Sequence, residues 1–192
     1  MSKAERLWAQ VINFLPDPTL AIDQEGRVIV WNRAMAELTG VTAAQILGKG
    51  DYAYALPIWG DRCPIMIDLV HHWSPEVAAK YTGITRKGHM LSSETKDLQI
   101  GAKSYHFRNT AGPLFDDAGE SIGAIETVRD ITASKNAELE LRRRQEFLES
   151  VLYHAPDAIV TLDADYRVAD WNPGAEQTFG YTRDESLGIP LE

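Results

Sequence analysis

The chain has 192 residues, of which 44% are hydrophobic and 24% charged, which is typical of a soluble globular protein with one full core and part of another. Its net charge of -9 argues against binding to nucleic acid or to an anionic membrane, because both attract basic surfaces. With one cysteine, Cys63, and no apolar run that could span a bilayer, we expect a cytoplasmic protein that has neither an intramolecular disulfide nor membrane contact within this stretch.

The first segments predict a helix, a hairpin and a second, short helix. Residues 1–14 carry apolar residues at helical spacing, and Pro16 ends that helix because proline lacks an amide donor. Two strands follow within residues 19–31, joined by a polar turn that contains a glycine. Asn32 is placed to cap a short helix over residues 33–38.

The middle of the chain changes from loop and helix to strands. Residues 49–62 have the composition of a long loop, and Pro64 is placed to open a helix over 65–73. A short turn or helix to Lys80 follows. A weak strand is then expected over 82–86, and three better ones over 91–98, 105–114 and 121–130. The predicted fold class is α+β: a five-stranded antiparallel sheet with helices on one face.

A long helix is predicted over residues 132–154, which are rich in Ala, Glu, Leu and Arg. Its apolar residues follow a rough three-four spacing, which Arg144 interrupts; they are Ala137, Leu141, Leu148 and Val151, with Ala155 beyond the helix. Two interpretations stand side by side, a short parallel coiled coil and a single linker helix.

The chain repeats itself at a constant offset of 140 residues. Twelve of forty aligned positions are identical between 11–50 and 151–190, against roughly two or three expected by chance. The pair Trp31 and Asn32 recurs as Trp171 and Asn172, which favours structural roles, an aromatic at a strand end and a helix cap, over ligand contact. Because the second copy lacks the later strands, we expect a fragment of a longer protein rather than a half-unit completed by a partner chain.

This order of elements, together with the sequences of residues 15–40 and 112–132, resembles tandem PAS domains. The stretch 112–132 ends in Asp130-Ile131-Thr132, which in that family marks the handover from the last strand to a signalling helix. The resemblance implies an N-terminal helix (1–14), a complete PAS domain (15–131), a helical linker (132–154) and the first part of a second PAS domain (155–192).

The resemblance also implies a function. PAS domains bind a small molecule or cofactor between sheet and helices, or dimerise, and pass the signal to an output domain. We expect a sensory and dimerisation module of a bacterial or archaeal signalling protein, with a histidine kinase as the output. The homodimer would form through the N-terminal and linker helices. The chain shows no catalytic motif of its own.

Candidate residues follow from these expectations. A ligand pocket between the sheet and the helices would use mostly apolar residues, namely Met35, Leu38, Tyr54, Trp59, Met66, Val70, Phe107 and Ile125, although ordinary core packing explains them equally well. Asp130 and Thr132 can cap the linker helix and relay the signal.

The alternative is a haem- or flavin-based receptor of redox state, gas or light, although the sequence requires no cofactor. Cys63 lacks the flanking sequence of the flavin-binding light sensors, which favours a core cysteine. His71 and His72 end a predicted helix near the place where haem-binding relatives hold their axial histidine, but they also suit a helix C-terminus. His154 aligns with Phe14 in the repeat, which argues against a phosphoacceptor. No Cys/His spacing indicates zinc.

Overall fold

The computed structural model describes residues 3–190. Residues 1–2 and 191–192, at the outer ends of the predicted N-terminal helix and of the second copy, lie outside this range. The contacts divide the chain into two compact units, with the division between Lys135 and Asn136. Within residues 3–190, no helix has both the length and the apolar composition that crossing a membrane requires.

The first unit is built on one antiparallel sheet with the strand order β2-β1-β6-β5-β4-β3. Its strands are β1 (Thr19–Asp23), β2 (Val28–Trp31), β3 (Thr82–Lys87), β4 (Met90–Ile100), β5 (Lys103–Phe115) and β6 (Ser121–Asp130). The predicted α+β class is confirmed, but the predicted number of five strands was too low. The weak strand, β3, pairs with β4 at the sheet edge and is exposed along nearly its whole length, so it lacks a buried apolar face.

The hairpin and the last strand belong to the same sheet, as the sequence predicted. Leu20 of β1 is opposite Trp31 on one side and opposite Glu126 of β6 on the other. A side-chain carbon at Gly123 would lie 2.1 Å from the carbonyl oxygen of Ile22, so the pairing of β1 with β6 requires glycine at this position.

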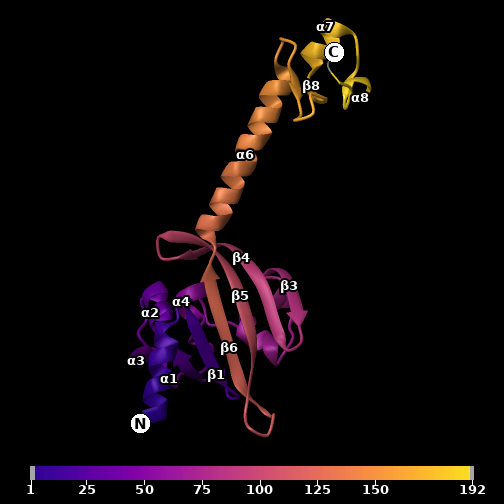
Figure 1. Ribbon diagram of the computed structural model, residues 1–192. Coiled ribbons are helices and arrows are strands. Elements are labelled where there is room, and N and C mark those ends of the chain that lie inside the picture. The colour runs from indigo at the N-terminus through magenta and orange to yellow at the C-terminus, as the bar shows by residue number, and fades with distance from the viewer. Residues whose placement is uncertain (1–2, 191–192) are drawn as a thin grey trace. The chain divides into compact units, whose positions relative to one another are not determined.

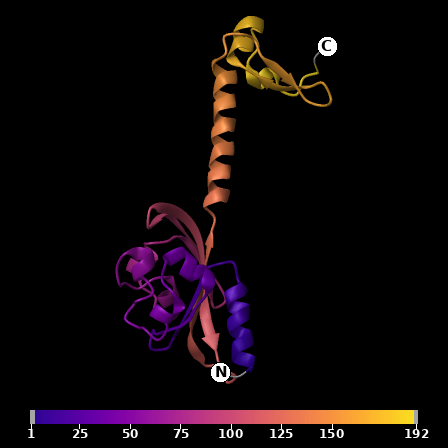
Figure 2. The ribbon, with the colours of Figure 1, turned by 90° about the vertical axis from the view of Figure 1, so that its left-hand side faces the viewer.

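Short helices cover one face of the sheet, as Figures 1 and 2 show. They are α2 (Arg33–Thr39), α3 (Ala43–Ile46), α4 (Leu56–Trp59), the 3-10 helix η1 (Met66–Val70) and α5 (Pro75–Ala78). Two predictions are corrected here. The loop predicted over 49–62 contains α4, and the helix predicted over 65–73 is reduced to the 3-10 helix η1. The 3-10 helix ends at Val70, and the next helix starts at Pro75, which favours the extended conformation that Ser74 adopts before it.

The helix α1 (Lys3–Phe14) touches the rest of the unit mainly through its last turn. The side-chain amide of the buried residue Asn32 donates to the carbonyl oxygens of Ile12 and Leu15 at 3.4 Å, and Asn13 accepts from the backbone amide of Arg33 at 2.9 Å. The apolar stripe of α1 stays exposed, and Phe14 keeps 82% of its surface accessible.

The second unit begins within α6 (Thr132–His154) and continues with β7 (Val160–Leu162), β8 (Val168–Trp171), α7 (Pro173–Phe179) and α8 (Arg183–Ser186). The helix predicted over 132–154 is therefore present. The second unit also repeats the hydrogen bonds of the first. Asn32 accepts from the amides of Thr19 and Met35, and Asn172 accepts from those of Ile159 and Ala175, all within 2.8–2.9 Å.

The tryptophans repeat in the same way. The indole N–H of Trp31 donates to the carbonyl of Val41 at 2.8 Å, and that of Trp171 donates to the carbonyl of Tyr181 at 3.0 Å. Both pairs hold a strand end and cap a helix, which confirms the structural roles predicted for Trp31 and Asn32.

Candidate functional site

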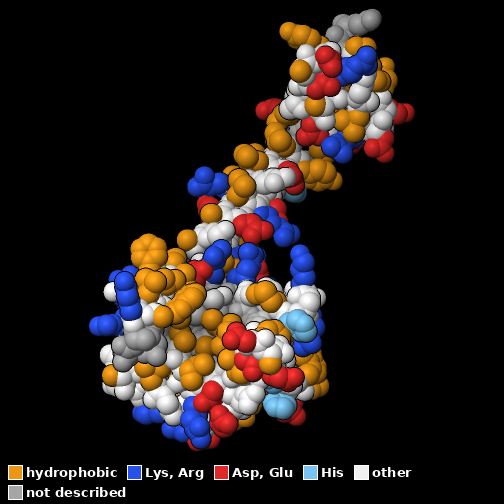
Figure 3. Space-filling model, turned by 60° about the horizontal axis from the view of Figure 1, so that its bottom comes forward, with side chains coloured by type: hydrophobic (Ala, Val, Ile, Leu, Met, Phe, Trp, Pro, Cys, Tyr) orange, Lys and Arg blue, Asp and Glu red, His pale blue; other side chains and the backbone are white. Residues whose placement is uncertain are grey.

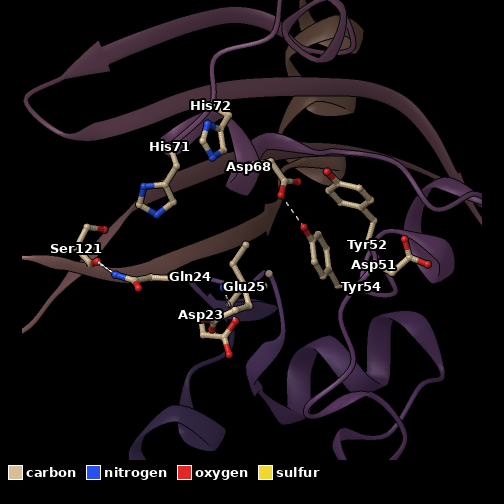
Figure 4. A pocket seen from close by; sticks show the side chains of 12 residues that line it. Asp23, Gln24, Glu25, Asp51, Tyr52, Tyr54, Asp68, His71, His72 and Ser121 are labelled. Carbon is tan, nitrogen blue, oxygen red and sulfur yellow. Dashed lines mark hydrogen bonds between the residues drawn. The ribbon is translucent and has the colours of Figure 1, made fainter.

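The first unit contains an open cleft of about 640 Å³. Four segments line it: the end of β1 with the β1–β2 turn, the loop before α4, η1 with the residues that follow it, and the start of β6. Figure 4 shows their labelled side chains, which are Asp23, Gln24, Glu25, Asp51, Tyr52, Tyr54, Asp68, His71, His72 and Ser121. The side-chain amide of Gln24 donates to the carbonyl of Ser121, which joins the turn to the start of β6.

A tyrosine–aspartate pair forms one wall of the cleft. The hydroxyl of Tyr54 donates to Asp68 Oδ1 at 2.6 Å, and the amide of Ile65 donates to Asp68 Oδ2 at 2.8 Å. Burial raises the pKa of the Asp68 carboxyl, although both hydrogen bonds oppose this shift. Burial, reinforced by the charge on Asp68, also raises the pKa of the Tyr54 hydroxyl, which therefore remains a donor.

Behind this wall lies a buried carboxyl group. Glu126 of β6 is 2% exposed, and its Oε2 accepts from the amide of Ile67 at 3.0 Å. Burial, followed by the nearby charge of Asp68, raises the pKa of Glu126 to about 8. The carboxyl is thus mostly protonated at neutral pH.

Seven of the eight residues predicted to line a ligand pocket pack into the core or against it. Met35, Tyr54 and Phe107 lie in the main hydrophobic cluster and Met66 lies in a second one, while Leu38, Trp59 and Val70 are partly buried against them. The void beside Trp59 and Phe107 measures only about 10 Å³, which is room for one water molecule at most. Tyr54 alone among these residues also lines the open cleft.

Ile125 differs from the other predicted residues in its orientation. Ala124, Glu126 and Val128 face the core, and side chains alternate along a strand, so Ile125 points to the opposite face of the sheet. Sequence reasoning named Ile125 and missed Glu126. The same alternation could have found Glu126, because it shares a face with two apolar neighbours.

The residues predicted to relay the signal lie together where β6 ends. Asp130 Oδ1 accepts from the amide of Thr132 at 2.8 Å, which satisfies the first amide of α6. The hydroxyl of Thr132 does not cap the helix; it accepts from the amide of His106 in β5 at 2.9 Å. The start of α6 is therefore fastened to a neighbouring strand as well as to its own.

The cysteine and histidine side chains that were considered as cofactor or phosphoacceptor sites lie apart from one another. Cys63 is half-buried, with Lys80 Nζ 3.1 Å from its sulfur. His71 Nε2 lies 3.1 Å from the carbonyl oxygen of Gly123, and His154 Nδ1 bonds to the carbonyl of Ser150 within α6. Among residues 3–190, no group of three His, Cys, Asp or Glu side chains is arranged to hold a metal ion.

Comparisons with known proteins add two kinds of similarity. A phytochrome of Picea abies is 25% identical over 186 residues, and phytochrome B of Nicotiana tabacum is 23% identical over 204 residues. These alignments cover 91% and 100% of this chain but only 15% and 16% of the relatives. The solved PAS domain of BvgS from Bordetella pertussis is 20% identical, with a TM-score of 0.45, and the match covers 75% of this chain and 99% of that structure.

The family models decide the classification. A model described as the PAS fold matches residues 12–136, and a second model with the same description matches residues 146–192. PAS domains are sensory modules of signalling proteins and are not catalytic. The first match spans the sheet with its covering helices, and the second spans the repeated hairpin. The chain belongs to the PAS fold family.

Proposed function

We propose that this chain is a sensory and dimerisation module that detects a small molecule and relays its binding through α6 to an output domain outside the chain. A histidine kinase is the output that we propose. The observation that carries the proposal is the junction at Asp130–Thr132, because it joins the sheet covalently and by hydrogen bonds to the helix that leaves the unit.

The junction can pass a movement of the sheet to α6 because several strands bind it. Thr132 is bound to β5 through the amide of His106, and the carbonyl of His106 accepts from the amide of Ile131 at 2.9 Å. Lys135 Nζ lies 3.3 Å from a carboxylate oxygen of Glu94 in β4. A shift of β4 or β5 relative to β6 must therefore change bonds in the first turn of α6.

The open cleft is the place that we propose for the ligand. It joins the β1–β2 turn to η1, and η1 lies against β5 and β6. Its lining is mixed, with carboxylates, imidazoles and the rings of Tyr52 and Tyr54, which suits a small polar molecule. The tightly packed core leaves the predicted internal pocket no comparable space.

Dimerisation is supported by apolar stripes that recur in the repeat. Leu7, Trp8 and Val11 of α1 are 45–66% exposed, and the positions 140 residues later, Phe147, Leu148 and Val151 of α6, are 49–67% exposed. Figure 3 shows hydrophobic side chains gathered beside the start of the chain. Because monomeric proteins rarely expose such patches, we propose that a second copy of the chain covers these stripes.

Three measurements test these proposals. The variant Asp130→Ala in a protein that includes the output domain should alter output regulation without unfolding the sensor, whereas Asp117→Ala in the exposed β5–β6 turn should not. Unchanged regulation in the Asp130 variant would refute the relay.

The other two measurements concern the ligand and the dimer. Native mass spectrometry of the gently purified chain should detect a retained small molecule, and an absorption spectrum of the same sample distinguishes haem or flavin from a colourless ligand. Light scattering should give the mass of a dimer for the native chain and of a monomer for Phe14→Glu, since Phe14 lies on the exposed face of α1. A native chain that is monomeric at all concentrations would exclude the proposed dimer.

A further inference from the structure

The buried side chain of Glu126 has no role in the function proposed above. Among the residues with described burial, it is the one Asp or Glu that is fully buried. It lies in the middle of β6, opposite Leu20 of β1 and Ala111 of β5, and four residues before Asp130. A lone acid in such a place costs stability when it is charged, so its presence calls for a physical explanation.

Glu126 is part of a set of side chains that hold η1. The first turn of a helix has amides without partners inside the helix. Here Asp68 binds the amide of Ile65 at 2.8 Å, the hydroxyl of Tyr81 accepts from the amide of Met66 at 2.8 Å, and Glu126 accepts from the amide of Ile67 at 3.0 Å. Of these three, the bond of Glu126 is the one that joins η1 directly to β6.

The surroundings of Glu126 are mainly acidic, and the nearby imidazole of His72 acts on Asp68 rather than on Glu126. Asp68 faces it from η1, while the phenol groups of Tyr54 and Tyr81 lie close enough for its charge to raise their pKa values. Thr95 of β4 and Asn109 of β5 line the same small void and are uncharged. No Lys, Arg or His is among the groups that shift the pKa of this carboxyl. Loss of its proton therefore places two carboxylates close together, and His72, which favours the charged form of Asp68, is not among the groups that shift the pKa of Glu126.

The void beside Glu126 is too small to hydrate a charge. Its volume of about 10 Å³ corresponds to one water molecule, while an ionised carboxylate needs several hydrogen-bond donors. Water can enter only if the covering layer moves. That layer includes Ile65, which also lines the void and directly precedes η1.

We propose that Glu126 is a proton-operated latch between β6 and η1. With the proton bound, the neutral carboxyl keeps its bond to Ile67, and η1 lies closed on the sheet. When the O–H bond breaks and the proton passes to water, the amide of Ile67 binds the carboxylate more strongly, but the missing hydration and the repulsion from Asp68 outweigh that bond, and η1 separates from β6 as water enters. The predicted effect of this motion on α6 rests on the proposed function, whereas the latch itself does not.

The test follows the backbone amide signals of the full chain by NMR from about pH 5 to about pH 10. The amide of Ile67 should titrate with a midpoint of about pH 8. The variant Glu126→Gln keeps an oxygen for Ile67 but cannot ionise, so this titration should vanish. Glu120→Gln, which alters an exposed acid just before β6, should leave it unchanged.

A second variant keeps the latch testable if Glu126→Gln fails to fold. Asp68→Asn removes the facing charge and should move the midpoint for Ile67 to lower pH. An unchanged midpoint in Asp68→Asn, a persisting titration in Glu126→Gln, or no titration in the native chain would each overturn the latch. The amide of Thr132 provides a separate readout. If Ile67 titrates while Thr132 does not, the latch stands and the relay to α6 fails.

Discussion

Replacement of Asn32 by alanine is expected to destabilise the first unit by about 3 kcal/mol. The loss of a helix cap accounts for about 1 kcal/mol of this. The remainder arises because the amide of Thr19, a residue with 0% exposure, loses its partner, and an unsatisfied buried group costs about 1–3 kcal/mol. The carbonyl of Asp17 also loses the side-chain amide that lies 3.0 Å from it.

Hydrogen exchange of individual amides measures this effect in each unit separately. Core amides of β1 and β6 that exchange through global unfolding should do so about 100-fold faster in Asn32→Ala, since about 1.4 kcal/mol corresponds to a factor of ten. The matched control is Asn172→Ala, which removes the equivalent bonds in the second unit and should leave β1 and β6 unchanged. A change below about 1 kcal/mol in Asn32→Ala would refute the assigned role.

Three further predictions concern the interior and the junction. The folded protein holds the proton of Glu126 more tightly than the unfolded chain, so the stabilisation from this proton is complete below about pH 4.5 and is lost towards pH 8. Urea unfolding should show that the free energy of unfolding falls by about 1.4 kcal/mol per pH unit in this range, and Glu126→Gln should lack this fall. Tyr54→Phe leaves Asp68 without its hydroxyl donor and should cost about 1.5–3 kcal/mol at neutral pH in the same assay, whereas no loss would mean that water replaces the hydroxyl. Thr132→Val removes the acceptor of the His106 amide and should cost about 1 kcal/mol with faster exchange of that amide, and unchanged protection there would argue against the fastening of α6 to β5.

Local patterns were sufficient for much of the fold. The offset of 140 residues identified two copies of one unit, and the recurrence of Trp31 and Asn32 predicted a strand end and a cap that both copies form. These predictions succeeded because a cap, a turn and a strand alternation depend on residues close in sequence. The long helix after Asp130 was equally readable, since its composition favours a helix without tertiary support.

Segments with weak local preferences were decided by tertiary contacts. Residues 65–73 were predicted to form a helix, but only the 3-10 helix η1 forms, and side chains from β6 and from Tyr81 bind its first amides. The edge strand β3 was underestimated because its partner β4, and not its own side chains, holds it in the sheet.

The sequence alone determined the family of the fold, the repeat and the junction to α6, because short stretches of neighbouring residues carry the pattern of each. Only the tertiary structure decided where the molecule has a cleft and which acid is buried in its interior. The core closes over the predicted pocket, and the open cleft lies between segments as distant as Asp23 and His71. The pKa of Glu126 likewise depends on Asp68, a residue 58 positions earlier that only the packing of η1 on β6 brings near.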